Sequence, residues 1–169
     1  AALLRGGERM NRGYNAYGRF PTGWVGAATS IAEKRAESNS GRATTQDRGA
    51  KKNIAGDVIG VLGERIAQWI RPELGVSLKL YESGAVAPKV DSNTGIDIKS
   101  SPWGRPRILI NAKQARHIRG IVIVIVDTQN SAFWMSETIR GDVVRSWPVF
   151  DGPYGDPAHY QYQSEVMRI

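Results

Sequence analysis

Cysteine is absent from this sequence of 169 residues. Its absence excludes disulfides, a thiol nucleophile and cysteine zinc sites, and it fits a reducing compartment, so we expect a cytoplasmic protein. Histidine is scarce as well, because only His117 and His159 occur, and they are too far apart to match the spacing of a metal-binding pair. Any metal chemistry would therefore depend on carboxylates.

Long hydrophobic runs are also missing. The longest, residues 121–126, is far shorter than the roughly 20 apolar residues that a membrane-spanning helix needs, so we expect no membrane partner. The opening residues, A-A-L-L-R-G-G-E-R-M, contain neither an initiator Met at the start nor the hydrophobic core of a signal peptide. We therefore expect no secretion, and a chain that begins inside a longer protein.

Positive charge is present in excess and is unevenly distributed. The 23 Lys and Arg outnumber the 16 Asp and Glu, for a net charge of +7. Residues 1–52 alone hold 10 Lys and Arg against 4 Asp and Glu, a net +6, and they interleave aromatic residues with Gly and Arg. Such a basic N-terminal arm suits a polyanion, because its cations displace counterions and its rings stack on bases. The alternative is a solvated tail that only keeps the protein soluble.

The rest of the chain has the pattern of a single α/β domain. We expect a core over residues 53–150 and a loop-rich C-terminal tail over residues 151–169. Helical spacing predicts a helix over residues 57–70, ended by Pro72, and a short helix over 141–147. Strand composition is found in six segments, at residues 76–82, 85–91, 96–101, 107–111, 121–127 and 132–139. Residues 121–126 are apolar on both faces and predict a central strand of a mixed sheet flanked by helices.

The segment V-D-S-N-T-G-I-D-I-K, residues 90–99, concentrates charge around a turn. If N-T-G is a three-residue hairpin loop with Gly95 in the left-handed region, Asp91 faces Asp97 directly. Two carboxylates about 5 Å apart repel each other unless a cation or proton offsets them. Strand alternation then places Lys99 on the face of Asp97. Magnesium, or manganese in its place, prefers such oxygen ligands.

Each of these residues also has an ordinary explanation. Asp91 could cap a turn, Asp97 and Lys99 could lie on a solvated strand face, and Glu64 could be an exposed helix position. Glu64, however, lies on a strip of Gly and Ala residues of an otherwise apolar helix, and small residues mark a close approach to a neighbouring element.

Asp91, the triplet D-I-K at 97–99 and a preceding helix with Glu64 together resemble the PD-(D/E)XK nuclease superfamily. The resemblance covers roughly residues 57–127 and implies a restriction-endonuclease-like αβββαβ core. It implies Glu64, Asp91 and Asp97 as metal ligands or their supports, and Lys99 as the catalytic lysine. The segments G-E-R-I-A, D-I-K and G-R-P-R-I-L-I are similar to small phage-encoded nucleases, which implies a prokaryotic or phage-infected cell.

The sequence departs from the family pattern in places. Val90 occupies the position of the proline that gives the PD motif its first letter, and only five residues separate Asp91 from Asp97. A second register, G-I-D at 95–97 with N-A-K at 111–113, resembles another branch and would make Lys113 the catalytic lysine. We favour Lys99, because Asp97 supplies an acidic ligand next to it.

These residues predict a magnesium-dependent endonuclease that hydrolyses DNA phosphodiesters. We expect contacts with the nucleic acid from Arg105, Arg107, Lys113, Lys51 and Lys52. RNA as the substrate and a homo-oligomeric assembly are left open. The alternative from another class is a non-enzymatic nucleic-acid-binding or virion structural protein that uses the basic arm.

Overall fold

The computed structural model is an α/β structure with two sheets and describes residues 2–4, 15–39, 50–76, 92, 94–151 and 156–168. The first sheet has the order β1-β2-β6-β5-β3, and β7 pairs with β5 at one end. Its strands are β1 (Ala2–Leu4), β2 (Ala16–Arg19), β3 (Ile96–Pro102), β5 (Gly120–Asp127), β6 (Ala132–Met135) and β7 (Ile139–Arg140). The second sheet is antiparallel, with the order β4-β9-β8, and consists of β4 (Arg107–Asn111), β8 (Val149–Asp151) and β9 (Pro157–Tyr162).

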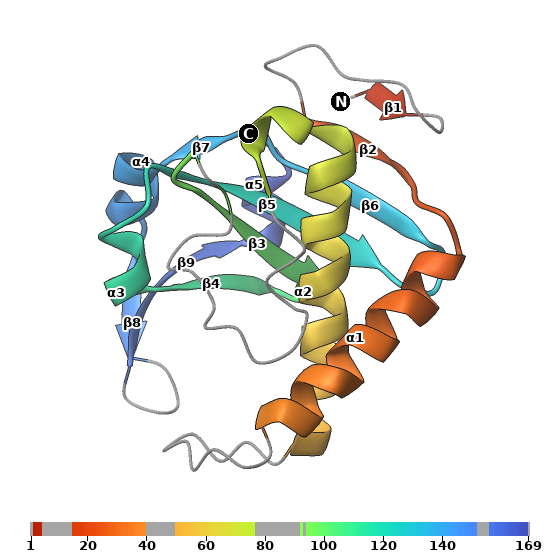
Figure 1. Ribbon diagram of the computed structural model, residues 1–169. Helices are drawn as coiled ribbons and strands as arrows, with labels where there is room; N and C mark the ends of the chain where they lie inside the picture. The colour runs from red at the N-terminus through yellow and green to blue at the C-terminus, as the bar shows by residue number, and fades with distance from the viewer. Residues whose placement is uncertain are drawn as a thin grey trace.

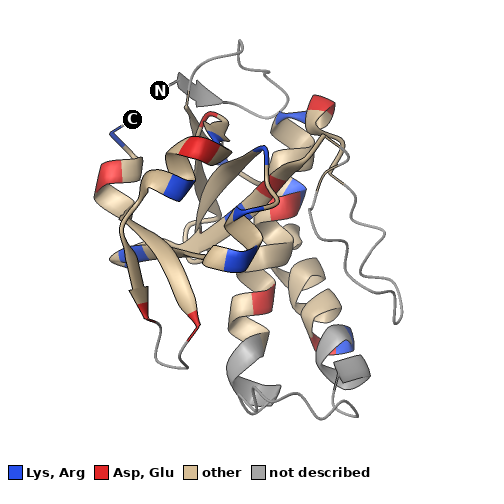
Figure 2. Ribbon diagram, turned by 90° about the vertical axis from the view of Figure 1, so that its left-hand side faces the viewer, with Lys and Arg blue, Asp and Glu red and all other residues tan. Residues whose placement is uncertain are grey.

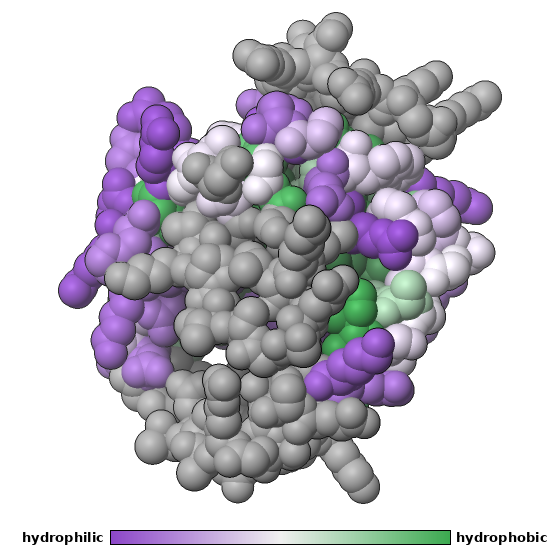
Figure 3. Space-filling view, viewed as in Figure 1, coloured by the Kyte–Doolittle hydropathy of each residue, from purple (hydrophilic) through white to green (hydrophobic). Residues whose placement is uncertain are grey.

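Two long helices cover one face of the first sheet, and the second sheet lies on its other side together with three short helices (Figure 1). The helices are α1 (Gly23–Asn39), α2 (Ala50–Ile70), α3 (Ala112–Ala115), α4 (Gly141–Ser146) and α5 (Gln163–Val166), with a 3-10 turn at Pro72–Leu74. In the described part of the chain, no helix is long and apolar enough to cross a membrane. The surface on the side of α3 and α4 is largely hydrophilic, with a small hydrophobic patch (Figure 3).

The alternation of β5 explains why the protein has two hydrophobic cores. Its Val122, Val124 and Val126 pack with α1 and α2, whereas its isoleucines face the second sheet. Those isoleucines are Ile121, Ile123 and Ile125, which are all fully buried. A strand that is apolar on both faces requires cover on both sides. The prediction of a buried central strand from its composition is therefore confirmed.

Several predicted elements agree with the structure. β4 and the helix over the G-D-V-V-R-S segment occupy their predicted places, and α2 ends at Ile70, two residues before Pro72. The predicted strand over 132–139 is divided into β6 and β7. At the division, the side-chain hydroxyl of Ser136 accepts a hydrogen bond from the N–H of Ile123 at 2.9 Å. The predicted strands over 76–82 and 85–91 lie outside the described residues, apart from a bridge between Val76 and Ser92.

The segment expected to form a basic arm differs from that expectation where it is described. β2 is a strand of the first sheet, next to β6, and α1 packs on α2. Ala16, Phe20 and Ala28 are buried in the same core as α2, because their apolar side chains gain more from burial than from water. α2 also begins at Ala50, before the predicted start at residue 57. The boundary at residue 52 is therefore not a domain boundary of the described fold.

The tail expected to be rich in loops also contains regular structure. β9 is the middle strand of the second sheet, and α5 follows it directly. Val166 of α5 is fully buried in the second core. The sequence did not predict the second sheet, because the composition of a strand does not indicate which other strand it pairs with.

Gly63 fixes how closely α2 approaches the sheet. A Cβ atom at this position would lie 1.8 Å from Oγ of Ser100 and 3.5 Å from Cβ of Val124. Gly60, one turn earlier on the same helix, has nothing within 4 Å of the equivalent position. The two glycines therefore have different roles in the same helix.

We predict opposite effects when each of these glycines is replaced by alanine. Gly63→Ala is expected to lower the free energy of unfolding by about 1–3 kcal/mol, because the added methyl overpacks the contact with Ser100. Gly60→Ala is the matched control and is expected to raise it by about 0.5–1 kcal/mol, because alanine is the better helix former. Urea unfolding measures both, and equal effects would contradict the close contact.

Candidate functional site

β3 carries two of the predicted site residues on one face. Parallel pairing with β5 aligns Asp97 with Ile121 and Lys99 with Ile123. These isoleucines face the second sheet, so Asp97 and Lys99 point to that side, while Ile98 packs in the core under α2. Asp97 is only 2% exposed. A solvated strand face is therefore excluded as the explanation for Asp97, and the predicted alternation of Asp97 and Lys99 is confirmed.

A glutamine joins these two side chains. Nε2 of Gln114 donates a hydrogen bond to Oδ2 of Asp97 at 2.7 Å. Oε1 of Gln114 accepts one from Nζ of Lys99 at 3.1 Å. This orientation of the amide is the one that charge dictates, since its donor meets a carboxylate and its acceptor meets an ammonium group. The three side chains, Asp97, Lys99 and Gln114, are called the β3–α3 trio below.

The crossover between β3 and β5 brings Gln114 to β3. It contains β4 and α3, and α3 begins directly after β4. Oδ1 of Asn111 accepts a hydrogen bond from the N–H of Lys113 at 2.9 Å and so caps the start of α3. At its other end, Nη1 of Arg145 donates to the carbonyls of Ala115 at 2.9 Å and Ile118 at 3.3 Å. The short helix is therefore held at both ends.

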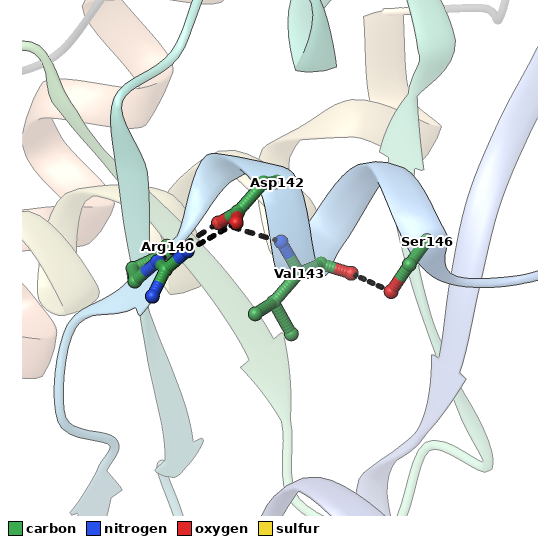
Figure 4. Close-up of polar contacts among 4 residues, drawn as sticks. All are labelled: Arg140, Asp142, Val143 and Ser146. Atoms are coloured by element: carbon green, nitrogen blue, oxygen red, sulfur yellow. Dashed lines mark hydrogen bonds and ion pairs between the residues drawn. The ribbon is translucent and has the colours of Figure 1, made fainter.

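Arg145 belongs to α4, which has its own local polar contacts (Figure 4). The carboxylate of Asp142 accepts hydrogen bonds from the guanidinium of Arg140 and from the N–H of Val143. The hydrogen bond from Arg140 is the main reason why the pKa of Asp142 is lowered. Oγ of Ser146 donates to the carbonyl of Val143 at 2.6 Å. These contacts order the six-residue helix that supplies Arg145.

Glu64 belongs to the layer of helices on the other face of the first sheet. It lies on α2, next to Gly63, and is only 7% exposed, so an exposed helix position is excluded. Residues of a helix are spaced by roughly 100°, so Glu64 lies about 100° from Gly63 and about 140° from Trp69. Gly63 meets β3, and Trp69 meets Trp24 of α1 at 5.5 Å between ring centroids. Glu64 therefore lies on the side of α2 that is turned away from α1.

The predicted partner of Asp97 cannot be placed. Asp91 lies outside the described residues, and so does the predicted opposition of the two aspartates. The turn that follows has the expected feature at Gly95, whose φ of 79° is in the left-handed region. The N–H of Ile96 bonds to the side chain of Ser92 at 3.1 Å.

The carboxyl groups suit a divalent cation by their chemistry, but they come from different layers: Asp97 lies on the face of β3 toward the second sheet, and Glu64 lies on α2. The carboxylates of Asp97 and Glu64 are the hard oxygen donors that magnesium prefers. Within the described ranges, no group of three or more His, Asp or Glu side chains is placed to hold a metal ion. The third predicted ligand, Asp91, is outside these ranges, so the predicted set of three acids stays a prediction.

The alternative register is not the one that the contacts favour. Lys113 is exposed, and its neighbour Gln114 is the residue of α3 that reaches Asp97. Arg105 and Arg107 are exposed as well, on the turn before β4 and on its first position. Lys51 and Lys52 lie in the first turn of α2, where only the backbone is described.

Sequence reasoning missed Gln114. It follows the N-A-K triplet directly, so the segment that was compared with a Q-A-K pattern ended one residue too early. Gln114 is a polar residue 15 positions after Lys99, in a segment too short to show helical periodicity. Nothing else in the sequence indicated that it contacts Asp97 and Lys99. Its role became visible only in the fold.

Comparison of the chain with protein-family models, with curated proteins and with solved structures found no match. The site must therefore be interpreted from its own geometry.

We predict that Gln114→Ala lowers the free energy of unfolding by about 1–2 kcal/mol, because a buried carboxylate and an ammonium group both lose a hydrogen bond. Gln129→Ala is the control, since Gln129 is exposed in the turn between β5 and β6. Urea unfolding of both variants measures the difference. Unfolding of the two variants at the same urea concentration would show that the amide of Gln114 does not stabilise the trio.

Proposed function

We propose that this protein is a metal-dependent nuclease of the PD-(D/E)XK type that hydrolyses DNA phosphodiester bonds. The observation that carries the proposal is the β3–α3 trio. It places a buried acid and a lysine, two positions apart on one strand, within reach of a single amide. If this face of β3 were exposed to water, water would hydrogen-bond the carboxylate and the ammonium group, and no amide would be required between them.

The connection between β3 and β5 gives the proposal further support. The two strands are parallel neighbours, and residues 103–119 cross between them with α3 on the way. Parallel neighbours require such a crossover. The final βαβ part of an αβββαβ core has the same requirement, and the lysine strand is the first strand of that unit.

In this proposal each residue has a distinct task. Asp97, with Asp91, would hold a magnesium or manganese ion, and Glu64 would complete or support the set of oxygen donors. The ion, when bound, neutralises charge on the phosphate and lowers the pKa of a water molecule. Lys99 orients the attacking water and stabilises negative charge that develops on the phosphate. Gln114 fixes the distance between Asp97 and Lys99.

The burial of Asp97 suits this task. An ionised carboxylate shielded from water interacts more strongly with a cation than an exposed one does, since the local dielectric constant is lower. The same burial is costly without a partner. The hydrogen bond from Gln114 offsets part of that cost in the metal-free protein.

We predict that Asp97→Asn and Lys99→Ala each abolish cleavage that depends on magnesium while DNA binding persists. Asn keeps the shape of Asp97 but removes the negative charge, and Ala removes the amine that orients water. The measurement is conversion of supercoiled, linear and single-stranded DNA with magnesium, manganese or a chelator. Lys34→Ala, an exposed position on α1, is the control and should cleave like the parent protein.

Two results would contradict this assignment. Full activity of both site variants would remove Asp97 and Lys99 from the reaction. Loss of activity in Lys113→Ala together with full activity in Lys99→Ala would assign the reaction to the second register. If the parent protein binds DNA in a salt-sensitive manner and never cleaves it, the protein is a non-enzymatic nucleic-acid-binding protein.

A further inference from the structure

The outer face of the second sheet is unusually rich in exposed apolar and aromatic side chains. Antiparallel pairing places Arg107 opposite Tyr162, and Leu109 opposite Tyr160. Directly paired residues share a face, and Ile108 and Ile110 on the alternate face are buried. Leu109 is 42% exposed and Tyr162 is 47% exposed. Such a face on a small protein is typical of an interaction site.

The rings on this face are ordered by one another and by an arginine. The ring of Tyr160 meets those of Phe150 and Tyr162 edge to face, with centroids 5.8 and 6.0 Å apart. The guanidinium carbon of Arg107 lies 5.4 Å from the ring centroid of Phe150 and 5.7 Å from that of Tyr160. These distances are in the range of cation–π interactions. Arg107 is therefore held on the sheet while it remains exposed.

A second exposed aromatic residue lies next to this face. Trp103 follows β3 directly and is 55% exposed, which excludes a role as a plug at the edge of the core. Its turn also carries Arg105. The side chain of Gln163, next to Tyr162 in the chain, accepts a hydrogen bond from the N–H of Gly104 at 2.9 Å and donates one to the carbonyl of Pro102 at 3.1 Å.

These bonds fix the turn beside the last residue of β9. The backbone N–H of Gln163 also bonds to the carbonyl of Pro106 at 2.9 Å. The backbone of the turn that carries Trp103 and Arg105 is therefore fixed next to Arg107 and Tyr162, and we call these four exposed residues the W103–Y162 surface. Trp103 lies four residues after Lys99, which is about 13 Å along an extended strand.

The charges of the second sheet are separated along β9. Asp151 is the last residue of β8, and Asp156 directly precedes β9. Arg105 and Arg107 lie near the other end, where Tyr162 is the last residue of β9. Acidic and basic residues are otherwise interspersed in this view (Figure 2). Positive charge and exposed rings therefore coincide at one end of the sheet.

We propose that the W103–Y162 surface binds single-stranded nucleic acid, with bases stacked on Trp103 and Tyr162 and phosphates bound by Arg105 and Arg107. Aromatic rings stack on bases of any sequence, and arginine binds phosphate oxygens with two parallel hydrogen bonds. In a duplex the bases are already stacked on each other, so the rings gain little there. Arginine and aromatic residues also occur together at protein–protein interfaces, so a second copy of the chain is the rival occupant that the test must distinguish.

This inference rests on the proposed function only for the identity of the substrate. If the protein is a nuclease, the surface makes an unpaired strand its preferred substrate class and places that strand beside Lys99. Binding itself requires no cleavage. The test therefore uses the Lys99→Ala protein in the presence of a chelator, so that failure of the nuclease proposal leaves the binding result interpretable.

The experiment measures fluorescence anisotropy of a labelled oligothymidylate and of a duplex of equal length, at low and high salt. We expect Trp103→Ala and Tyr162→Ala each to weaken binding of the single strand by about 5-fold or more, up to about 150-fold, which is the effect of losing one stacked base. Binding of the duplex should change much less. Val143→Ala is the control, because Val143 is an apolar residue that is 41% exposed on α4, outside the second sheet, and should leave both affinities unchanged.

Three outcomes would overturn the proposal. Unchanged affinity in both Trp103→Ala and Tyr162→Ala would remove this surface from binding. Equal loss for the single strand and the duplex would replace stacking by contacts to the backbone alone. A dimer in light scattering that Tyr162→Ala converts to a monomer would assign the surface to a second copy of the chain. Thermal unfolding of each variant confirms that it is folded.

Discussion

The parallel pairing of β3 with β5 is the constraint on which the site depends. Because the two strands run in the same direction, they cannot be joined by a tight turn, and the chain must cross from one end of the sheet to the other. The crossover supplies Arg105 and Arg107 near its start and Gln114 near its end. The same pairing sets the register that turns Asp97 and Lys99 away from α2. Without this pairing, the crossover would not bring Gln114 next to Asp97 and Lys99.

Burial of Asp97 has an energetic consequence for the fold. Transfer of an ionised carboxylate out of water is unfavourable unless hydrogen bonds and opposite charge offset it. An apolar residue in its place would match the neighbouring isoleucines of β5. The chain instead keeps an acid and connects it through Gln114 to a lysine, with α4 holding the helix that carries Gln114. Three elements thus cooperate to place a polar group where an apolar residue would satisfy the packing, and this supports the proposed roles of Asp97 and Lys99.

The sequence was most informative where one strand or helix could be judged alone. Residues 121–126 are apolar on both faces, and D-I-K alternates with isoleucines, so the central strand and the faces of Asp97 and Lys99 could be predicted. β2 could not, because A-Y-G-R has little strand propensity and is held by its pairing with β6. Gln114 was missed for a similar reason, since α3 has four residues and no periodicity. Which strands share a sheet depends on contacts that are distant in the chain.

The second sheet connects these observations. Its inner face, together with the short helices α3, α4 and α5, completes the core over Ile121, Ile123 and Ile125. Its outer face is turned to water, and the exposed residues there, Leu109 and Tyr162, gain less from burial than the residues of the inner face. β4 contributes Ile108 and Ile110 to the inner face and Arg107 and Leu109 to the outer one. β4 also belongs to the crossover that contains Gln114. Folding of this one segment therefore orders both the trio and the outer face of the second sheet. A nucleic-acid strand bound on that face would be positioned relative to Lys99 by the protein backbone itself.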